Sequence, residues 1–265
     1  MQHNLNAEYW NAIADTYQQV TRISTKDFHY GPLLPGDSEL DLLPQSLQGM
    51  RCLEIGAGAG QNSIFLAGMG AKCTALDVSP RQIEYGKELA RKAGADVQFV
   101  LADMDELNGA IQGPFDLVHS TYALPFSHNP AAVVKSCARL LTAAGTFLLT
   151  TGHPLYSGEW VEFEPGEEGL FLHNYYQPES DVREPDQFHK GTAANYHSIA
   201  TVMSWLLEAG FVVDRFLEPE PLPIPLLEEE EIWKRVPYDS EEWRSLYHVL
   251  SAVPVVMIFK CRMRT

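Results

Sequence analysis

The chain has 265 residues, of which 45% are hydrophobic and 20% are charged, a composition that suits a globular protein with a sizeable core. Its net charge of −16 opposes sequence-independent attraction to phosphate backbones, so we expect no nucleic-acid partner. No apolar run approaches the ~20 residues needed to cross a bilayer, and no basic segment followed by an apolar core begins the chain. We therefore expect no membrane partner and a cytoplasmic location.

The four cysteines are spread along the chain and lack the paired spacing of a metal site. Cys52 and Cys73 fall within predicted core strands. We expect all four, which include Cys137 and Cys261, to be reduced structural thiols, and we expect no metal.

The N-terminal part of the chain predicts a helix followed by an aromatic loop. Residues 8–20 place apolar side chains at helical spacing, so one face of this helix can pack on a core. Residues 28–36 combine His29 and Tyr30 with two prolines and two glycines. The loop forms either part of a substrate-pocket wall or a structural connector, and a short helix is expected over 38–47.

The centre of the sequence is the stretch 53–60, which reads Leu-Glu-Ile-Gly-Ala-Gly-Ala-Gly. Residues 51–55 suit a buried parallel strand, and the alternating glycines then allow a sharp turn into a helix over 61–68. Such a turn leaves backbone N–H groups uncovered at a helix N-terminus. We expect a nucleotide-like ligand to lie there.

Three further strands follow at regular spacing. Residues 71–77 end in Asp77, whose carboxylate can accept both hydroxyls of a ribose. Residues 98–103 end in Asp103, and residues 115–120 form the fourth strand. Strands alternating with helices predict a doubly wound α/β domain whose ligand lies at the carboxyl ends of the strands.

The connecting helices have clear boundaries. Ser79 is a plausible N-cap, Pro80 takes the first helical position and Gly94 ends this helix. Another amphipathic helix is expected over 131–141, with a fifth strand over 146–151. His153 follows this strand, where it either takes a proton from a bound acceptor or is a buried histidine bonded to backbone.

Residues 155–194 are too numerous for a connector and rich in aromatic and acidic side chains. We interpret 154–194 as a cap with β-hairpin character that folds over the ligand. After it we expect a helix over 195–210, a sixth strand over 211–217, a surface excursion over 218–231, a short helix over 240–249 and a last strand over 253–261.

Five motifs in order make this chain resemble the class I S-adenosylmethionine-dependent methyltransferases: Glu54, the Gly56/Gly58/Gly60 spacing, Asp77, Asp103 with Met104, and Phe115-Asp116-Leu117-Val118. The resemblance runs from about Tyr9 to Leu149. It implies a seven-stranded, mostly parallel sheet with an antiparallel last strand. The core would comprise 49–153 and 195–265, with 1–48 as N-terminal helices and substrate-side loop.

The resemblance also implies roles for individual residues, with S-adenosyl-L-methionine as cofactor. Tyr17 resembles the aromatic residue that lies over the cofactor; the alternative is that it only packs the N-terminal helix on the core. Asp103 would accept a hydrogen bond from the adenine amine, or merely cap a loop. The full cofactor set is Tyr17, Glu54, Gly56, Ala57, Gly58, Gly60, Asp77, Val78, Asp103, Met104 and Ser120. The predicted substrate residues are Tyr30, Tyr122 and Tyr196, and the predicted proton acceptors are His153 and His29.

The predicted reaction is methyl transfer to an oxygen or nitrogen of a small molecule, by a monomer or homodimer. Residues 120–130 lack the Asp/Asn-Pro-Pro-aromatic motif of enzymes that methylate nucleobase amines. A non-catalytic cofactor-binding sensor or partner subunit is an alternative. A nicotinamide-dependent dehydrogenase is another, but it would normally show Gly-x-Gly-x-x-Gly.

Overall fold

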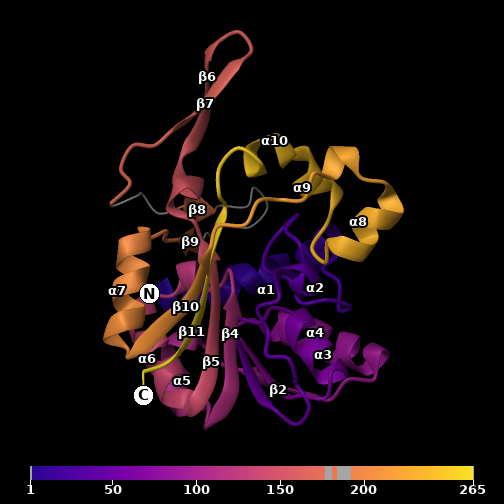
Figure 1. Cartoon of the computed structure of the whole chain (residues 1–265), viewed down its shortest axis with the longest axis vertical. Helices are drawn as coiled ribbons and strands as arrows, with labels where there is room; N and C mark the ends of the chain where they lie inside the picture. Colours follow the sequence, from indigo (N-terminus) through magenta and orange to yellow (C-terminus); the bar gives the residue numbers. More distant parts are fainter. Residues whose placement is uncertain (1, 177–180, 184–191, 265) are drawn as a thin grey trace.

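The computed structural model describes residues 2–176, 181–183 and 192–264. Its centre is a seven-stranded sheet of order β10-β11-β5-β4-β1-β2-β3, with helices on both faces (Figure 1). β11 runs antiparallel to both β5 and β10, which confirms the predicted doubly wound sheet with an antiparallel last strand. The strands are β1 (Arg51–Ile55), β2 (Lys72–Asp77), β3 (Val97–Leu101), β4 (Phe115–Thr121), β5 (Leu141–Gly152), β10 (Phe211–Leu217) and β11 (Val256–Met263).

The helices begin and end where capping residues allow. The Ser79 hydroxyl accepts the N–H of Gln82, and Gly94 ends the same helix at a φ of 67°, as predicted. The helices are α1 (Gln2–Thr21), α2 (Asp37–Leu40), α3 (Gln61–Gly68), α4 (Pro80–Ala93), α5 (Leu107–Ala110), α6 (Pro130–Leu140), α7 (Ile199–Glu208), α8 (Glu229–Arg235), α9 (Glu241–Ser245) and α10 (Tyr247–Leu250).

The helix predicted over 38–47 is wrong in length, because α2 stops at Leu40. Asp41 takes a left-handed φ of 50°, and the Asp37 carboxylate accepts the N–H groups of Leu42 and Leu43 at 2.8 and 3.1 Å. A side chain that bonds the following backbone competes with the next helical turn, so the chain leaves the helix there.

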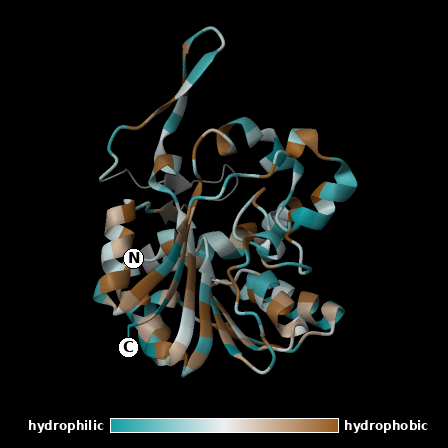
Figure 2. Ribbon diagram, viewed as in Figure 1, coloured by the Kyte–Doolittle hydropathy of each residue, from teal (hydrophilic) through white to brown (hydrophobic). Residues whose placement is uncertain are grey.

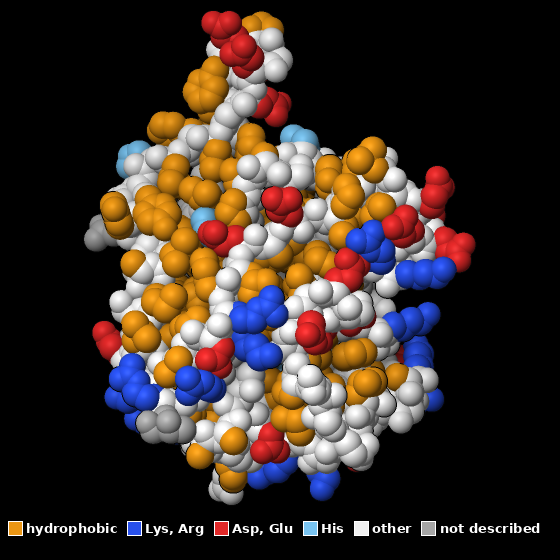
Figure 3. Space-filling model, in the orientation of Figure 1, with side chains coloured by type: hydrophobic (Ala, Val, Ile, Leu, Met, Phe, Trp, Pro, Cys, Tyr) orange, Lys and Arg blue, Asp and Glu red, His pale blue; other side chains and the backbone are white. Residues whose placement is uncertain are grey.

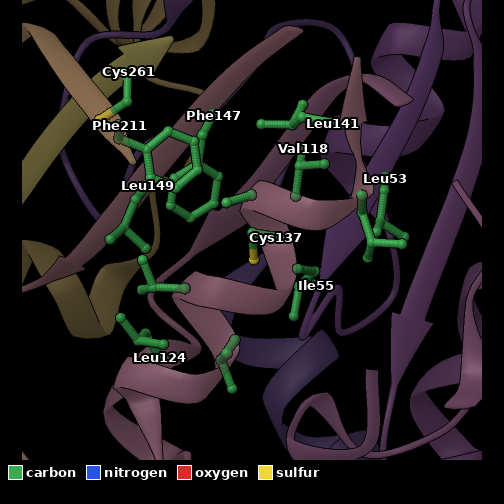
Figure 4. Packing of buried hydrophobic residues seen from close by; sticks show 14 of the residues in the cluster. Leu53, Ile55, Val118, Leu124, Cys137, Leu141, Phe147, Leu149, Phe211 and Cys261 are labelled. Atoms are coloured by element: carbon green, nitrogen blue, oxygen red, sulfur yellow. The ribbon is translucent and has the colours of Figure 1, made fainter. Parts of the chain in front are cut away.

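Alternate residues of the central strands supply two separate hydrophobic cores, one on each face of the sheet. Val118 belongs to the core under α5, α6 and α7, whereas its neighbour Leu117 belongs to the core that includes residues 28–47. Phe147 and Phe211 stack in the first core with ring centroids 5.0 Å apart (Figure 4). Hydrophobic residues accordingly follow the strands of the sheet in Figure 2. The sheet therefore has both faces buried and offers ligands only its carboxyl edge.

The segment after β5 has the predicted hairpin character. β6 (Glu159–Glu164) pairs with β7 (Glu167–Phe171), and β8 (Asp181–Arg183) pairs with β9 (Thr192–Ala194). The β6–β7 hairpin extends away from the body of the protein (Figure 1), exposes Phe163 and carries acidic side chains at its tip (Figure 3). Whether it closes over the ligand stays a prediction.

The excursion predicted over 218–231 is wrong, because part of this segment is core. Leu222 and Ile224 are buried, and the N–H of Leu222 donates to the carbonyl of Leu33 at 3.0 Å. Proline and glutamate dominate the composition here, so the two apolar side chains that anchor the segment carried little weight in the sequence. The segment covers the second core beside residues 28–47.

All four cysteines are buried and free, as expected. Cys52 and Cys73 are register partners on β1 and β2, inside the sheet. No helix among the described residues is both long and apolar enough to pass through a membrane.

Gly86 tests the packing of α4 on the sheet. A Cβ there would lie 2.4 Å from Phe99 Cε1 and 2.8 Å from the carbonyl oxygen of Ala59. We expect Gly86→Ala to lower the free energy of unfolding by about 1–3 kcal/mol in urea, despite the higher helix propensity of alanine. Gly109→Ala is the control, because its Cβ meets open space, and it should be neutral or stabilising. Equal effects of the two variants would contradict this packing.

Candidate functional site

The turn between β1 and α3 places three glycines in the left-handed region. Gly56, Gly58 and Gly60 have φ values of 64°, 56° and 68°, which few other residues adopt. A Cβ on Gly56 would lie 2.2 Å from the Cβ of Ala123, and one on Gly60 would lie 3.0 Å from Phe99. A Cβ on Gly58 would meet nothing within 4 Å. Gly56 and Gly60 therefore serve packing, whereas Gly58 borders an open space that a ligand can fill.

Asp77 ties the end of β2 to this turn. One carboxylate oxygen accepts the N–H of Gly58 at 2.7 Å, and the other accepts the N–H of Ser79 at 2.8 Å. Burial raises the pKa of the Asp77 carboxyl to about 6, against the opposing effect of these hydrogen bonds. A carboxylate can accept about four hydrogen bonds, so this one retains capacity for a ligand hydroxyl beside its backbone donors.

Glu54 performs a similar task at the end of β1. Its Oε2 accepts both the N–H of Ser63 at 3.0 Å and the Ser63 hydroxyl at 2.6 Å, which holds the first turn of α3. Burial raises the pKa of the Glu54 carboxyl to about 7. Two buried carboxyl groups with raised pKa values thus flank one turn, an arrangement typical of a binding site.

These groups line a hollow at the carboxyl edge of the sheet, which encloses about 940 Å³ when the open solvent at its mouth is included. α1, the glycine turn and the segments that follow β2, β3 and β4 contribute its walls. Nine of the predicted cofactor residues line it: Tyr17, Glu54, Gly56, Ala57, Gly58, Asp77, Val78, Asp103 and Met104.

The other two predicted cofactor residues lie behind the wall. Gly60 is the N-cap of α3 and packs on Phe99, and Ser120 donates its hydroxyl hydrogen to the carbonyl of Ile55 at 2.9 Å. Asp103 lines the hollow and also caps a short 3₁₀ turn by accepting the N–H of Asp105 at 2.8 Å. The capping interpretation of Asp103 is therefore confirmed, and its hydrogen bond to an adenine amine stays a prediction.

Three glutamines that the sequence did not mark as site residues form a hydrogen-bonded chain in the hollow. Gln18 donates to Gln82 at 2.8 Å and accepts from Gln61 at 2.9 Å, which joins α1, α3 and α4 at the wall. Isolated glutamines on helices resemble a solvated face in sequence, so no local signal could have identified this contact.

A second hollow adjoins the first, and both share walls from α1 and from the end of β4. Tyr122 lines both hollows and holds a left-handed φ of 59°, which is unusual for a bulky residue. Its hydroxyl lies 3.1 Å from that of Tyr196, which is itself buried. The predicted pair of Tyr122 and Tyr196 is thus brought together, with Tyr122 nearer the site.

Tyr30, the third predicted substrate residue, is not brought to either hollow. Its ring is fully buried in the core that covers the second face of the sheet, and its hydroxyl donates to the Asp37 carboxylate. The loop 28–36 therefore has the predicted structural role, and its role as a substrate-pocket wall stays a prediction. His29 reaches the site, and Tyr30 anchors the loop.

The two predicted proton acceptors have different surroundings. His29 lines both hollows, and its Nδ1 has no hydrogen-bond partner among the described residues. Burial lowers the pKa of His29 to about 3, so its ring is neutral at physiological pH. Its role in catalysis stays a prediction.

His153 lines neither hollow, so the structure does not support its expected position beside the reacting group. Its Nδ1 accepts the N–H of Leu155 at 3.1 Å, and its Nε2 therefore donates to Glu218 at 2.8 Å. Burial lowers the pKa of His153, and the Glu218 carboxylate opposes this shift. The ring therefore caps the turn after β5. This agrees with the second role predicted from the sequence, a buried histidine bonded to backbone.

Among the described residues, no group of three or more His, Cys, Asp or Glu side chains could hold a metal ion. Backbone N–H groups donate to the carboxylates of Glu54, Asp77 and Asp103.

Comparison with known proteins shows which proteins this chain resembles. Residues 53–149 match the family described as "Methyltransferase domain". Ubiquinone biosynthesis O-methyltransferases from Xanthomonas campestris and Xylella fastidiosa are 30% and 33% identical to this chain over 106 residues. The matched stretch covers 40% of this chain and 44% and 43% of those proteins, so the chain spans less than half of these relatives.

Solved structures show the same fold over most of the chain. A putative S-adenosylmethionine-dependent methyltransferase from Listeria monocytogenes is similar with a TM-score of 0.67 and 21% identity, over 85% of this chain and 95% of that one. One from Mesorhizobium loti is similar with a TM-score of 0.62 and 23% identity, over 84% and 94%. These likenesses establish the fold.

Gly58 and Gly56 should respond differently to the same substitution. We expect Gly58→Ala to weaken binding of S-adenosylhomocysteine at least tenfold in calorimetry, because its Cβ enters the open space, with about 1 kcal/mol of backbone strain. Gly56→Ala should instead lower the melting temperature by several degrees more than Gly58→Ala, because its Cβ meets Ala123. Unchanged affinity of a folded Gly58→Ala variant would contradict a ligand beside this glycine.

The buried carboxyl groups predict a pH dependence of stability. Since Glu54 and Asp77 have pKa values of about 7 and 6 when folded, the folded state binds more protons than the unfolded state above pH ~4. The contribution of these two groups to stability should be greatest below that pH. It should then fall as the pH rises to about 7. The slope is at most about 1.4 kcal/mol per pH unit for each group.

Glu54→Gln should flatten this fall in unfolding experiments between pH 5 and 8. Glu208→Gln removes one exposed charge and is the control for general repulsion within an acidic protein. Identical slopes in the two variants would show that Glu54 does not carry the effect.

Proposed function

Because residues 53–149 are a methyltransferase domain and the chain has the class I fold that its motifs predicted, we propose that the protein transfers the methyl group of S-adenosylmethionine to a small molecule. The observation that carries this proposal is the single hollow that gathers nine of the predicted cofactor residues around the glycine turn. Nothing in the described residues favours the dehydrogenase or the non-catalytic alternative.

The residues of the hollow fit this cofactor. Asp77 offers a ribose hydroxyl the acceptor capacity that its backbone donors leave free, beside the open face of Gly58. Asp103 and Met104 border the place for the adenine, and Glu54 offers its carboxylate to the methionine ammonium. When bound, S-adenosylmethionine supplies an activated methyl group on a sulfonium.

The remaining task of the chain is to align an acceptor and to exclude water. Trp10 and Tyr17 on α1 lie in the walls of both hollows, so α1 bridges the cofactor site and the second hollow. We place the acceptor in the second hollow. The name of the curated relatives supports an oxygen acceptor.

We also propose that residues 154–194 form a cap. Tyr156 lines the second hollow, and Ala194 packs with Phe126 and Tyr196 beside it. The two ends of the segment therefore flank the proposed acceptor site, which supports a role in acceptor choice.

Calorimetric titration with S-adenosylhomocysteine tests the cofactor site. We expect the wild-type protein to bind and Asp77→Ala to bind about 10- to 100-fold more weakly, because charged hydrogen bonds to ribose contribute about 1.5–3 kcal/mol. Asp96→Ala, which removes an exposed carboxylate before β3, should bind like the wild type. A folded wild-type protein that does not bind this ligand would refute the proposal.

A further inference from the structure

The second hollow has walls made mainly of aromatic rings. We call it the aromatic chamber and define it by Trp10, Tyr17, Tyr122, Tyr156, Tyr238 and Trp243. These residues come from α1, the end of β4, the turn after β5 and the segment around α9. The chamber encloses about 630 Å³ when the open solvent at its mouth is included, so we expect its ligand to be a small molecule.

The chamber carries no formal charge. The described residues that line it include no Asp, Glu, Lys or Arg side chain. Its one histidine, His29, is neutral because burial lowers the pKa of the imidazole to about 3. Burial likewise raises the pKa of Tyr238 well above its ordinary value, so its phenol also stays neutral. A charged ligand group would therefore lose its hydration without gaining an opposite charge.

The hydroxyl groups of the chamber already have partners. Those of Tyr17 and Tyr238 lie 3.0 Å apart, and those of Tyr122 and Tyr196 lie 3.1 Å apart. These pairs fix the rings across the chamber. His29 is different, because its Nδ1 is buried without a partner among the described residues and its ring meets Tyr238 edge-on at 5.4 Å. An unpaired buried nitrogen carries a cost that a water or a ligand hydroxyl bonded to this imidazole would offset.

We propose that the aromatic chamber selects an uncharged aromatic acceptor that carries a hydroxyl group and rejects anionic and cationic molecules of the same size. This inference rests on the proposed methyl transfer, since the chamber and the cofactor hollow share walls formed by His29, Thr121 and Tyr122. Edge-to-face contacts with the surrounding rings favour a flat aromatic ligand. Aromatic rings also attract cations, but the chamber offers no carboxylate to complete such a site.

Three probes with one catechol ring separate the possible charges: 4-tert-butylcatechol is neutral, 3,4-dihydroxyphenylacetate is anionic and dopamine is cationic. Each is titrated calorimetrically into the protein saturated with S-adenosylhomocysteine, whose own binding is measured first. We expect the neutral probe to bind at least tenfold more tightly than either charged one. Equal or tighter binding of a charged probe, or no binding of the neutral probe, would overturn the inference. Loss of S-adenosylhomocysteine binding would instead refute the proposed function.

A matched pair of variants tests the location. Trp243 lines the chamber but not the cofactor hollow, whereas Trp233 on α8 is 67% exposed and lines neither. Trp243→Arg should lower the affinity for the neutral probe at least fivefold and raise the affinity for the anionic probe. The variant should still fold and bind S-adenosylhomocysteine with unchanged affinity. Trp233→Arg should leave the affinity for each of the three probes unchanged. Identical effects of the two variants would place the acceptor elsewhere.

Discussion

The central constraint of the structure is the turn between β1 and α3. Its left-handed backbone favours glycine, and two buried carboxyl groups accept the backbone N–H groups of the turn and of α3. Gly56, Gly58 and Gly60 adopt left-handed conformations, and Asp77 and Glu54 accept N–H groups from the turn and from α3. These hydrogen bonds join β1, β2 and α3 at the edge of the sheet. The cost of burying the two groups appears in their raised pKa values, about 6 and 7. The same turn leaves the face of Gly58 open, so the constraint that orders this edge also creates the ligand space.

The two adjoining hollows divide the work of the site by their chemistry. The cofactor hollow contains carboxylates and exposed backbone, which can bind hydroxyl and amine groups. The aromatic chamber contains rings whose hydroxyls bond one another, so it can discriminate mainly by shape and by lack of charge. Tyr122 lines both hollows at a left-handed φ of 59°, and its hydroxyl lies 3.1 Å from that of Tyr196. Backbone strain is thus retained at one of the residues that the two hollows share.

Sequence was sufficient for features that depend on local physical chemistry. The strands followed from apolar runs and α4 from Ser79 and Gly94, and the resemblance to methyltransferases indicated nine residues that line one hollow. It was insufficient where a residue's surroundings come from distant segments. The aromatic chamber draws on residues from Trp10 to Val256, none of which signals the others in sequence. Residues 222–224 were misjudged for the same reason, since their burial depends on packing against residues 28–47.

The histidines and tyrosines show why the acceptor side is harder to predict than the cofactor side. A cofactor contact made by backbone N–H groups or by a carboxylate at a strand end is fixed by topology, because parallel strands bring their ends to one edge. His153 also lies at such an edge, yet Glu218 and the N–H of Leu155 occupy both its ring nitrogens. His29 comes from a loop with no strand-end position, yet it lines both hollows. The strand-end rule therefore locates groups correctly, but only the partners supplied by the tertiary fold decide which of them remains available for chemistry.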